Sequence, residues 1–164
     1  MNFSSQIMNN GGSLANHNGR NLENFIKQIL LQNNYKECTK SKTAILNNRI
    51  NITEKLFMPQ VYVGDTIYGT KRIVDFFILN KNLFPEGLII ECKWQQSKGS
   101  VDEKYPFLVL NIIKTKIPTI VLIDGGGYKP TAMQWLKEQA APNNILMAVY
   151  TMAEFQKAIN AKLL

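Results

Sequence analysis

The chain has few of the residues that build catalytic triads, zinc sites and disulfides. Its 164 residues include one histidine, His17, and two cysteines, Cys38 and Cys92, without a C-x-x-C pair. A lone histidine in a polar segment speaks against a histidine-based triad and against a zinc site. Two cysteines without a pairing pattern indicate free thiols, so we expect a reducing, cytoplasmic environment.

Long apolar runs are missing as well. No run approaches the roughly 18 residues of a membrane helix, and residues 1–19 lack the basic start and apolar core of a signal peptide. We therefore expect no membrane contact. Acidic residues are scarce too, since 12 Asp and Glu oppose 19 Lys and Arg and leave a formal net charge of +7. This excess favours a polyanionic partner, although many basic proteins bind no nucleic acid.

The length and an ordinary hydrophobic content of 45% predict one domain with room for a full core. Residues 1–18 are rich in Asn, Ser and Gly, and we expect them to be mobile. The single domain is therefore predicted to span residues 19–164.

Helical apolar spacing predicts an amphipathic helix that starts near Asn21 and ends near Asn33–Asn34, with Leu22, Phe25, Ile26, Ile29 and Leu30 on its apolar face. Residues 36–58 are harder to assign, and only the short apolar run Ala44–Leu46 can be placed. The following run, residues 60–69, predicts a strand or hairpin around a Gly64–Asp65 turn.

Strands and helices alternate in the rest of the chain. Strands are predicted at 71–79, 88–95, 117–124 and 144–150. Helices are predicted at 129–139 and after two capping-box spacings, Ser100 with Glu103 and Thr151 with Glu154; the first of these helices begins at Val101. This order predicts an α/β fold with a mixed central sheet, parallel in its later strands, and helices on its faces.

The charged side chains of greatest interest lie in the stretch from Lys71 to Gln95. Asp75 interrupts one apolar strand, and Glu91, Lys93 and Gln95 alternate along the next, so these three share one strand face. Ionised groups on such apolar strands destabilise the fold unless they are paired or bind a ligand. The stretch therefore predicts a site.

Two carboxylates and a lysine suit a metal-dependent phosphodiesterase. Mg²⁺ takes one or two carboxylates and keeps several waters, so Asp75 and Glu91, with the backbone carbonyl of Cys92, are candidate ligands. Lys93 would hold the attacking water or stabilise negative charge, and Gln95 would bind water or phosphate. The simpler alternative is a salt bridge between Glu91 and Lys93 on an edge strand.

Two other features compete for the chemistry. The run DGGGYKP between a strand and a helix lacks the spacing of nucleotide-binding loops, so a flexible turn is favoured, although Lys129 remains a candidate phosphate contact. Glu23 lies in the first turn of the predicted helix. It is either a helix-dipole carboxylate or an acid delivered to the site from outside the sheet.

The pattern Asp75 … Glu91-Cys92-Lys93 resembles the Asp…(Glu/Asp)-x-Lys signature of the PD-(D/E)XK nuclease superfamily, the restriction-endonuclease-like fold, with Val74 where the name has proline. Glu23 is similar to the extra acid that many members carry on their first helix. ECKWQQSKGSVDEKYPF resembles small restriction-type and mobile-element nucleases. The resemblance spans roughly residues 20–160 and is most detailed from Asp75 to Lys104.

The resemblance implies a Mg²⁺-dependent DNA endonuclease, with Mn²⁺ as a possible substitute, that leaves a 5′-phosphate. Asp75 and Glu91 would bind the metal, Lys93 would be the catalytic lysine, and Gln95 and Glu23 would be accessory. The expected partner is double-stranded DNA, cut at specific sites by a homodimer or by a tetramer. Candidate DNA contacts flank the site: Lys71, Arg72, Lys98, Ser100, Lys104 and Lys129.

Three alternatives remain. A Holliday-junction resolvase would use the same residues but recognise branched DNA. A non-catalytic DNA-binding module would keep the fold without the reaction, although the intact Asp75, Glu91 and Lys93 speak against a decayed site. A plain α/β protein with a surface salt bridge would bind no metal.

Overall fold

The structure, a computed structural model, describes residues 10–96 and 102–164, with side chains from Arg20 onward. Its centre is a six-stranded mixed sheet in the order β1-β2-β3-β4-β5-β6. Strands β2, β3 and β4 pair antiparallel, whereas β4, β5 and β6 pair parallel and β1 pairs parallel with β2. The strands are β1 (Lys36–Glu37), β2 (Leu56–Asp65), β3 (Lys71–Asn80), β4 (Phe84–Trp94), β5 (Thr119–Asp124) and β6 (Leu146–Tyr150).

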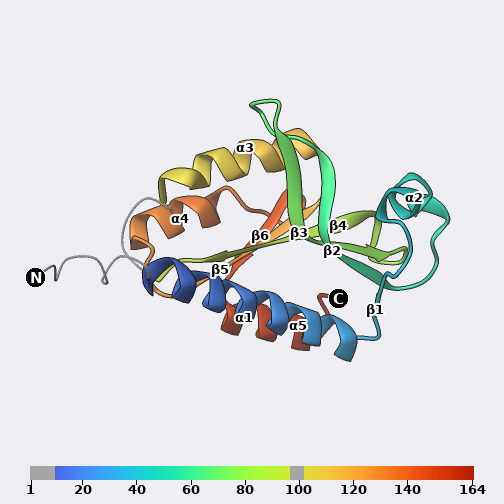
Figure 1. Ribbon diagram of the computed structural model, residues 1–164, viewed down its shortest axis with the longest axis horizontal. Helices are drawn as coiled ribbons and strands as arrows, with labels where there is room; N and C mark the ends of the chain where they lie inside the picture. The colour runs from blue at the N-terminus through green and yellow to red at the C-terminus, as the bar shows by residue number, and fades with distance from the viewer. Residues whose placement is uncertain (1–9, 97–101) are drawn as a thin grey trace, which may run out of the picture.

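Helices cover both faces of this sheet (Figure 1). One face packs against α1 and α5 through a cluster that includes Ile26, Ile90 and Phe155. The other face packs against α3 and α4 through a cluster that includes Val109, Val121 and Leu136. The helices are α1 (Asn10–Gln32), α2 (Lys42–Asn47), α3 (Tyr105–Thr115), α4 (Pro130–Glu138) and α5 (Met152–Asn160), with short 3₁₀ turns η1 (Arg49–Asn51) and η2 (Asp102–Lys104). The α/β architecture with a mixed sheet is as predicted.

The later half of the chain follows the predicted alternation of strands and helices. Strand β4 leads through α3 to β5, through α4 to β6, and then to α5. Pro130 occupies the first turn of α4, where its missing N–H is harmless. Thr151 and Glu154 form the expected reciprocal capping box at the start of α5. These local signals place the helix starts correctly because the first-turn N–H groups of a helix lack intrahelical partners: Pro130 carries no such N–H, and the Thr151 and Glu154 side chains accept two backbone N–H groups.

The β2–β3 hairpin differs in detail from the prediction. Gly64 has a φ of +115° but lies inside β2, where the pairing with β3 shifts between Tyr62 and Asp65. The reversal itself comes later, at Thr66–Thr70, where the Thr66 N–H donates to the Thr70 carbonyl at 2.7 Å. Glycine therefore marks a bulge here and not the turn.

Two predicted helix starts also differ. Helix α1 begins at Asn10, so residues 10–18 form its first turns, while residues 1–9 are outside the described part. Ser100 and Val101, the expected cap and start of the next helix, also fall outside the described residues. The α-helix proper begins at Tyr105, after the η2 turn, because Pro106 is tolerated only in a first turn.

No helix in the described part of the chain is long and apolar enough to cross a bilayer.

Candidate active site

The site forms where β3 and β4 separate. Their regular pairing reaches Phe76 opposite Ile90 and does not extend to Asp75. Beyond that point the Asp75 side chain takes the place of a strand partner, because its Oδ2 accepts the backbone N–H of Cys92 at 2.7 Å. The end of the antiparallel ladder therefore turns a carboxylate toward the next strand.

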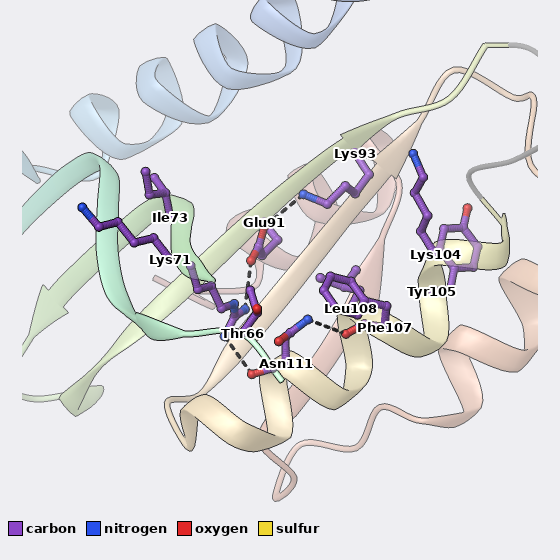
Figure 2. Close-up of a pocket in the computed structure, with 11 residues that line it drawn as sticks. Thr66, Lys71, Ile73, Glu91, Lys93, Lys104, Tyr105, Phe107, Leu108 and Asn111 are labelled. Carbon is purple, nitrogen blue, oxygen red and sulfur yellow. Dashed lines mark hydrogen bonds and ion pairs between the residues drawn. The ribbon is translucent and has the colours of Figure 1, made fainter. Parts of the chain in front are cut away.

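Lys93 joins the two carboxylates that the sequence singled out. Its Nζ lies 3.0 Å from Glu91 Oε2 and 3.6 Å from Asp75 Oδ2. Figure 2 shows the contact between Lys93 and Glu91 along β4. The Lys93 side chain is 35% exposed, Asp75 is 19% exposed and Glu91 only 6%. The three side chains therefore form one cluster that is open to solvent at the lysine.

The two faces of β4 are used as strand alternation predicts. Ile90 belongs to the core under α1, and Cys92 and Trp94 pack against the same cluster. Glu91 and Lys93 instead line a cleft of about 270 Å³ against α3. The charged and the apolar side chains of β4 thus lie on opposite faces of the strand, because successive residues alternate between the faces.

Arg72 forms a buried ion pair with Glu91. Its Nη2 lies 2.9 Å from Glu91 Oε1, and its Nη1 donates to the Asn111 carbonyl at 2.9 Å and to Thr115 Oγ1. Arg72 is 5% exposed. Arg72 was expected to contact DNA, but its guanidinium is nearly inaccessible and binds Glu91, Asn111 and Thr115 inside the protein. Val74, two residues further along β3, shares a strand face with Arg72 and is fully buried. Side chains of a strand alternate between its faces, so the sequence already indicated that Arg72 points toward the buried side.

These contacts shift the proton affinities in the cluster. Burial by itself would raise the pKa of Glu91, but Lys93 and Arg72 lower it below the ordinary value, so the carboxylate is ionised. Burial would lower the pKa of Lys93, but Glu91 and Asp75 outweigh it and raise that pKa. Lys93 is therefore a firmly held cation between two carboxylates.

Glu23 of α1 lies close enough to the cluster for Asp75 and Lys93 to shift its pKa. Burial raises the pKa of Glu23, and the negative charge of Asp75 raises it further, while Lys93 and Arg20 act in the opposite direction. Because α1 begins at Asn10, Glu23 is not in its first turn. The helix-dipole interpretation therefore does not apply, and delivery of this acid to the site stays a prediction.

Gln95 has different partners from those expected. It is 2% exposed, and its Nε2 donates to Asp102 Oδ1 at 3.0 Å while its Oε1 accepts from the Tyr105 hydroxyl at 2.9 Å. Gly125 packs so tightly here that a Cβ would lie 2.5 Å from the Gln95 carbonyl oxygen. Gln95 thus ties the end of β4 to α3 and to the glycine turn, and binding of water or phosphate by Gln95 stays a prediction.

The remaining candidate DNA contacts fall into two groups. Lys71 and Lys104 are exposed and line the cleft beside Glu91. Lys129 is exposed at the start of α4 and uses its backbone N–H on Asp102, 3.4 Å away. Lys98 and Ser100 are outside the described residues. The glycine run before Lys129 is a turn with positive φ at Gly125 and Gly126, as favoured from the sequence.

The chemistry of the donors fits a hard divalent cation. Among described residues, no three His, Cys, Asp or Glu side chains converge as a metal site, so Glu23 does not join Asp75 and Glu91 as a ligand and these two carboxylates are the available protein set. Mg²⁺ is commonly held by one or two carboxylates and keeps its waters. A cation, the Lys93 ammonium, already lies between these carboxylates. The Cys92 carbonyl as a third ligand stays a prediction.

Gln60 is a neighbour of the site that the sequence did not reveal. It has a φ of +51° within β2, and its Nε2 lies 3.4 Å from Asp75 Oδ1. The Lys42 ammonium donates to the carbonyls of Pro59 and Gln60 and so holds this irregular strand segment. A non-glycine residue at positive φ inside a strand has no sequence signature.

Comparison with known proteins adds a family to this geometry. No curated protein and no solved structure matches the chain. A family model, described as the PD-(D/E)XK nuclease superfamily domain, matches residues 14–163, nearly the whole chain. With the α/β sheet and the Asp75–Glu91–Lys93 cluster, this match identifies the chain as a member of the PD-(D/E)XK nuclease superfamily, with the restriction-endonuclease-like fold.

Proposed function

We propose that this protein is a Mg²⁺-dependent DNA endonuclease that hydrolyses phosphodiester bonds in double-stranded DNA at specific sites. The observation that carries the proposal is the cluster in which Lys93 Nζ lies 3.0 Å from Glu91 and 3.6 Å from Asp75. The net charge of +7 supports a polyanionic substrate, and membership of a nuclease superfamily supports the reaction class.

In the proposed reaction, Asp75 and Glu91 hold the cation and Lys93 orients the attacking water. When bound, Mg²⁺ lowers the pKa of a coordinated water and neutralises charge on the phosphate oxygens. The water oxygen bonds to phosphorus, the bond from phosphorus to O3′ breaks, and the products are a 5′-phosphate and a 3′-hydroxyl. Lys93, kept protonated by its carboxylate neighbours, stabilises the negative charge that develops.

Glu23 and Gln95 take accessory roles in this proposal. Glu23 adds a third carboxylate, whose own pKa is shifted by the charges of Asp75 and Lys93. Gln95, held between Asp102 and Tyr105, fixes the end of the strand that carries Glu91 and Lys93. Lys71 and Lys104 would meet DNA phosphates on either side of the cleft.

We further propose that a homodimer cuts both strands, since one cluster serves one strand and a two-fold assembly matches the symmetry of a duplex site. A tetramer is the alternative assembly. The free thiols Cys38 and Cys92 support a reducing, cytoplasmic setting.

The test is a digest of plasmid and phage DNA with Mg²⁺ or Mn²⁺. We expect cutting that stops with EDTA and falls by about 100-fold or more in Asp75→Ala, Glu91→Gln and Lys93→Ala. Glu91→Gln is preferred to alanine because it keeps a partner for Arg72. Religation of the products would demonstrate the 5′-phosphate.

Matched controls are Glu138→Ala and Lys157→Ala, which remove an exposed carboxylate and an exposed ammonium from α4 and α5. Both should cut like the wild type. Discrete bands indicate site specificity, whereas a smear contradicts it. Metal-dependent cutting that survives all three site substitutions would refute the proposed roles.

A further inference from the structure

The cleft beside Glu91 and Lys93 has largely apolar walls. Ile73 of β3 lines one side, and Phe107 and Leu108 of α3 line the other, with Glu91 and Lys93 on the floor (Figure 2). A site for phosphate groups alone calls for polar donors, since carbon surface gives a phosphate no hydrogen bond. An apolar part of the substrate is therefore expected next to the reacting phosphate.

Exposed apolar side chains continue from the cleft along the β2–β3 hairpin. Ile73 is 56% exposed and pairs across the strands with Tyr62, which is 51% exposed. Tyr68, at the hairpin turn, is 76% exposed. Proteins that bind unpaired nucleic acid use exposed aromatic residues of this kind as platforms for bases.

The cleft is held open by contacts between the hairpin and α3. The Ile67 N–H donates to Asn111 Oδ1 at 2.8 Å, and Lys114 Nζ donates to the Thr66 carbonyl at 2.7 Å. Tyr68 stacks on Phe107 with ring centroids 5.0 Å apart. The hairpin rises from the sheet beside α3 (Figure 1). The walls are therefore preformed, which reduces the ordering that a ligand must impose.

Positive charge lies on both walls. Lys71 extends from the hairpin side and Lys104 from the start of α3, and both are exposed (Figure 2). Lysines act on phosphates as mobile point charges. The arrangement has one cation on each side of an apolar slot, with the proposed catalytic lysine between them, and so it complements a nucleotide with phosphates on both sides.

From these features we infer that the cleft binds one unpaired nucleobase next to the scissile phosphate; this inference rests on the proposed function. The volume of about 270 Å³ is below the roughly 300–1,000 Å³ of pockets for drug-sized ligands, so it suits a single base and not a base pair. In a paired duplex that base must leave the stack, which costs free energy. A duplex would therefore be cut only after this base leaves the stack, and a duplex whose base is already unpaired at the cut should be cut faster.

The experiment uses two readouts on oligonucleotides of one sequence. Cleavage is compared for the paired duplex, the duplex with a mismatched central segment, and the single strand. Base capture is followed by the fluorescence of 2-aminopurine within oligothymidine, using the Lys93→Met protein with Mg²⁺ so that cutting does not intervene. Ile73→Asp places a charge in the cleft, and Ile113→Asp is its control, an isoleucine of matching exposure, 55%, on α3 that does not line the cleft.

We expect the mismatched duplex or single strand to be cut at least about tenfold faster than the paired duplex, because the unpairing is already done. Ile73→Asp should remove this preference and the fluorescence change, and Ile113→Asp should keep both. Efficient cutting of paired duplex, with no preference and no effect of Ile73→Asp, overturns the inference and leaves the proposed function standing. If nothing is cut, a fluorescence change that depends on Ile73 still supports the base site while the proposed function fails; no change overturns both.

Discussion

At the scale of single residues, Glu91 is held by two cations in different surroundings. Arg72 binds one carboxylate oxygen inside the protein, where both side chains are nearly inaccessible, and Lys93 binds the other at the edge of the cleft. The buried pair occupies one oxygen of Glu91, and the other oxygen contacts the Lys93 ammonium. We therefore predict that Arg72 acts through Glu91 as a positioning residue.

We predict that Arg72→Met lowers the free energy of unfolding by about 3–5 kcal/mol, because it leaves the Glu91 charge buried with one partner fewer. The double variant Arg72→Met/Glu91→Gln should regain most of that stability, since no unpaired buried charge remains, yet stay inactive. Urea denaturation measures both. As a control, Arg49→Met removes a pair with Glu86 at 3.4 Å that is partly exposed, and should cost only about 0–1 kcal/mol. An equal loss in the two single variants would contradict the role of burial.

Gly125 shows how one backbone position supports the site. It has a φ of +105°, and an added Cβ would lie 2.5 Å from the Gln95 carbonyl oxygen. Gly126 has a φ of +71° with nothing within 4 Å of such a Cβ. Both glycines therefore have a positive φ, but only at Gly125 would an added Cβ overlap a neighbouring residue.

We predict that Gly125→Ala destabilises the protein by about 1–3 kcal/mol or more from strain and overlap, and also slows cleavage by shifting the end of β4. Gly126→Ala should cost roughly 1 kcal/mol from strain alone and leave cleavage unchanged. Thermal unfolding and cleavage rates test this pair. Equal behaviour of both variants would show that the close approach to Gln95 is unimportant.

At the scale of elements, the first turn of α5 carries a capping box that also contacts α4. The Thr151 hydroxyl accepts the Glu154 N–H, the Glu154 carboxylate accepts the Thr151 N–H, and Lys137 of α4 contacts Glu154 at 2.7 Å. Burial would raise the pKa of Glu154, but Lys137 and Thr151 lower it overall. The cap therefore joins two helices on opposite faces of the sheet.

We predict that Thr151→Ala costs about 1 kcal/mol of unfolding free energy through loss of this cap. Because the pKa of Glu154 is lower in the folded state, its contribution is present above the ordinary carboxyl pKa and is lost as pH falls through the folded value. The stability gap between wild type and Glu154→Gln should thus be largest near neutral pH and close in acid. Thr131→Ala, an exposed threonine of α4, serves as the control and should change little.

At the scale of the whole molecule, the excess of basic residues matters more than any single lysine. If DNA is the substrate, as proposed, a net charge of +7 should favour its binding by release of counterions, and affinity should fall steeply with salt. Among the residues that the structure describes, Lys71 and Lys104 are exposed lysines that line the cleft.

We predict that Lys71→Ala and Lys104→Ala each weaken DNA binding across all sequences and reduce the slope of log affinity against log salt by about 1. Lys157→Ala, an exposed lysine on α5, should leave the slope unchanged. Fluorescence anisotropy at several salt concentrations measures the slope. A slope that Lys157→Ala reduces as much as the cleft lysines would indicate diffuse charge and no defined path for DNA.

Much of the fold and part of the site could be predicted from the sequence because their causes are local. Apolar periodicity identified α1 and the strands of the parallel half, and the spacing of Thr151 and Glu154 located the start of α5. Alternation along β4 placed Glu91 and Lys93 together, apart from Ile90. These signals work because neighbours in the chain determine caps and strand faces.

Only the tertiary structure decided which partner each site residue has. The separation of β3 from β4 lets Asp75 accept the Cys92 N–H, α3 supplies the carbonyl that holds Arg72, and Asp102 and Tyr105 engage Gln95. By itself, the sequence determined that Asp75, Glu91 and Lys93 carry charge on apolar strands, which requires pairing or a ligand. These partners lie on other elements, from 7 to 39 residues away in the chain, and their distances depend on how the whole sheet and its helices pack, which no local pattern records.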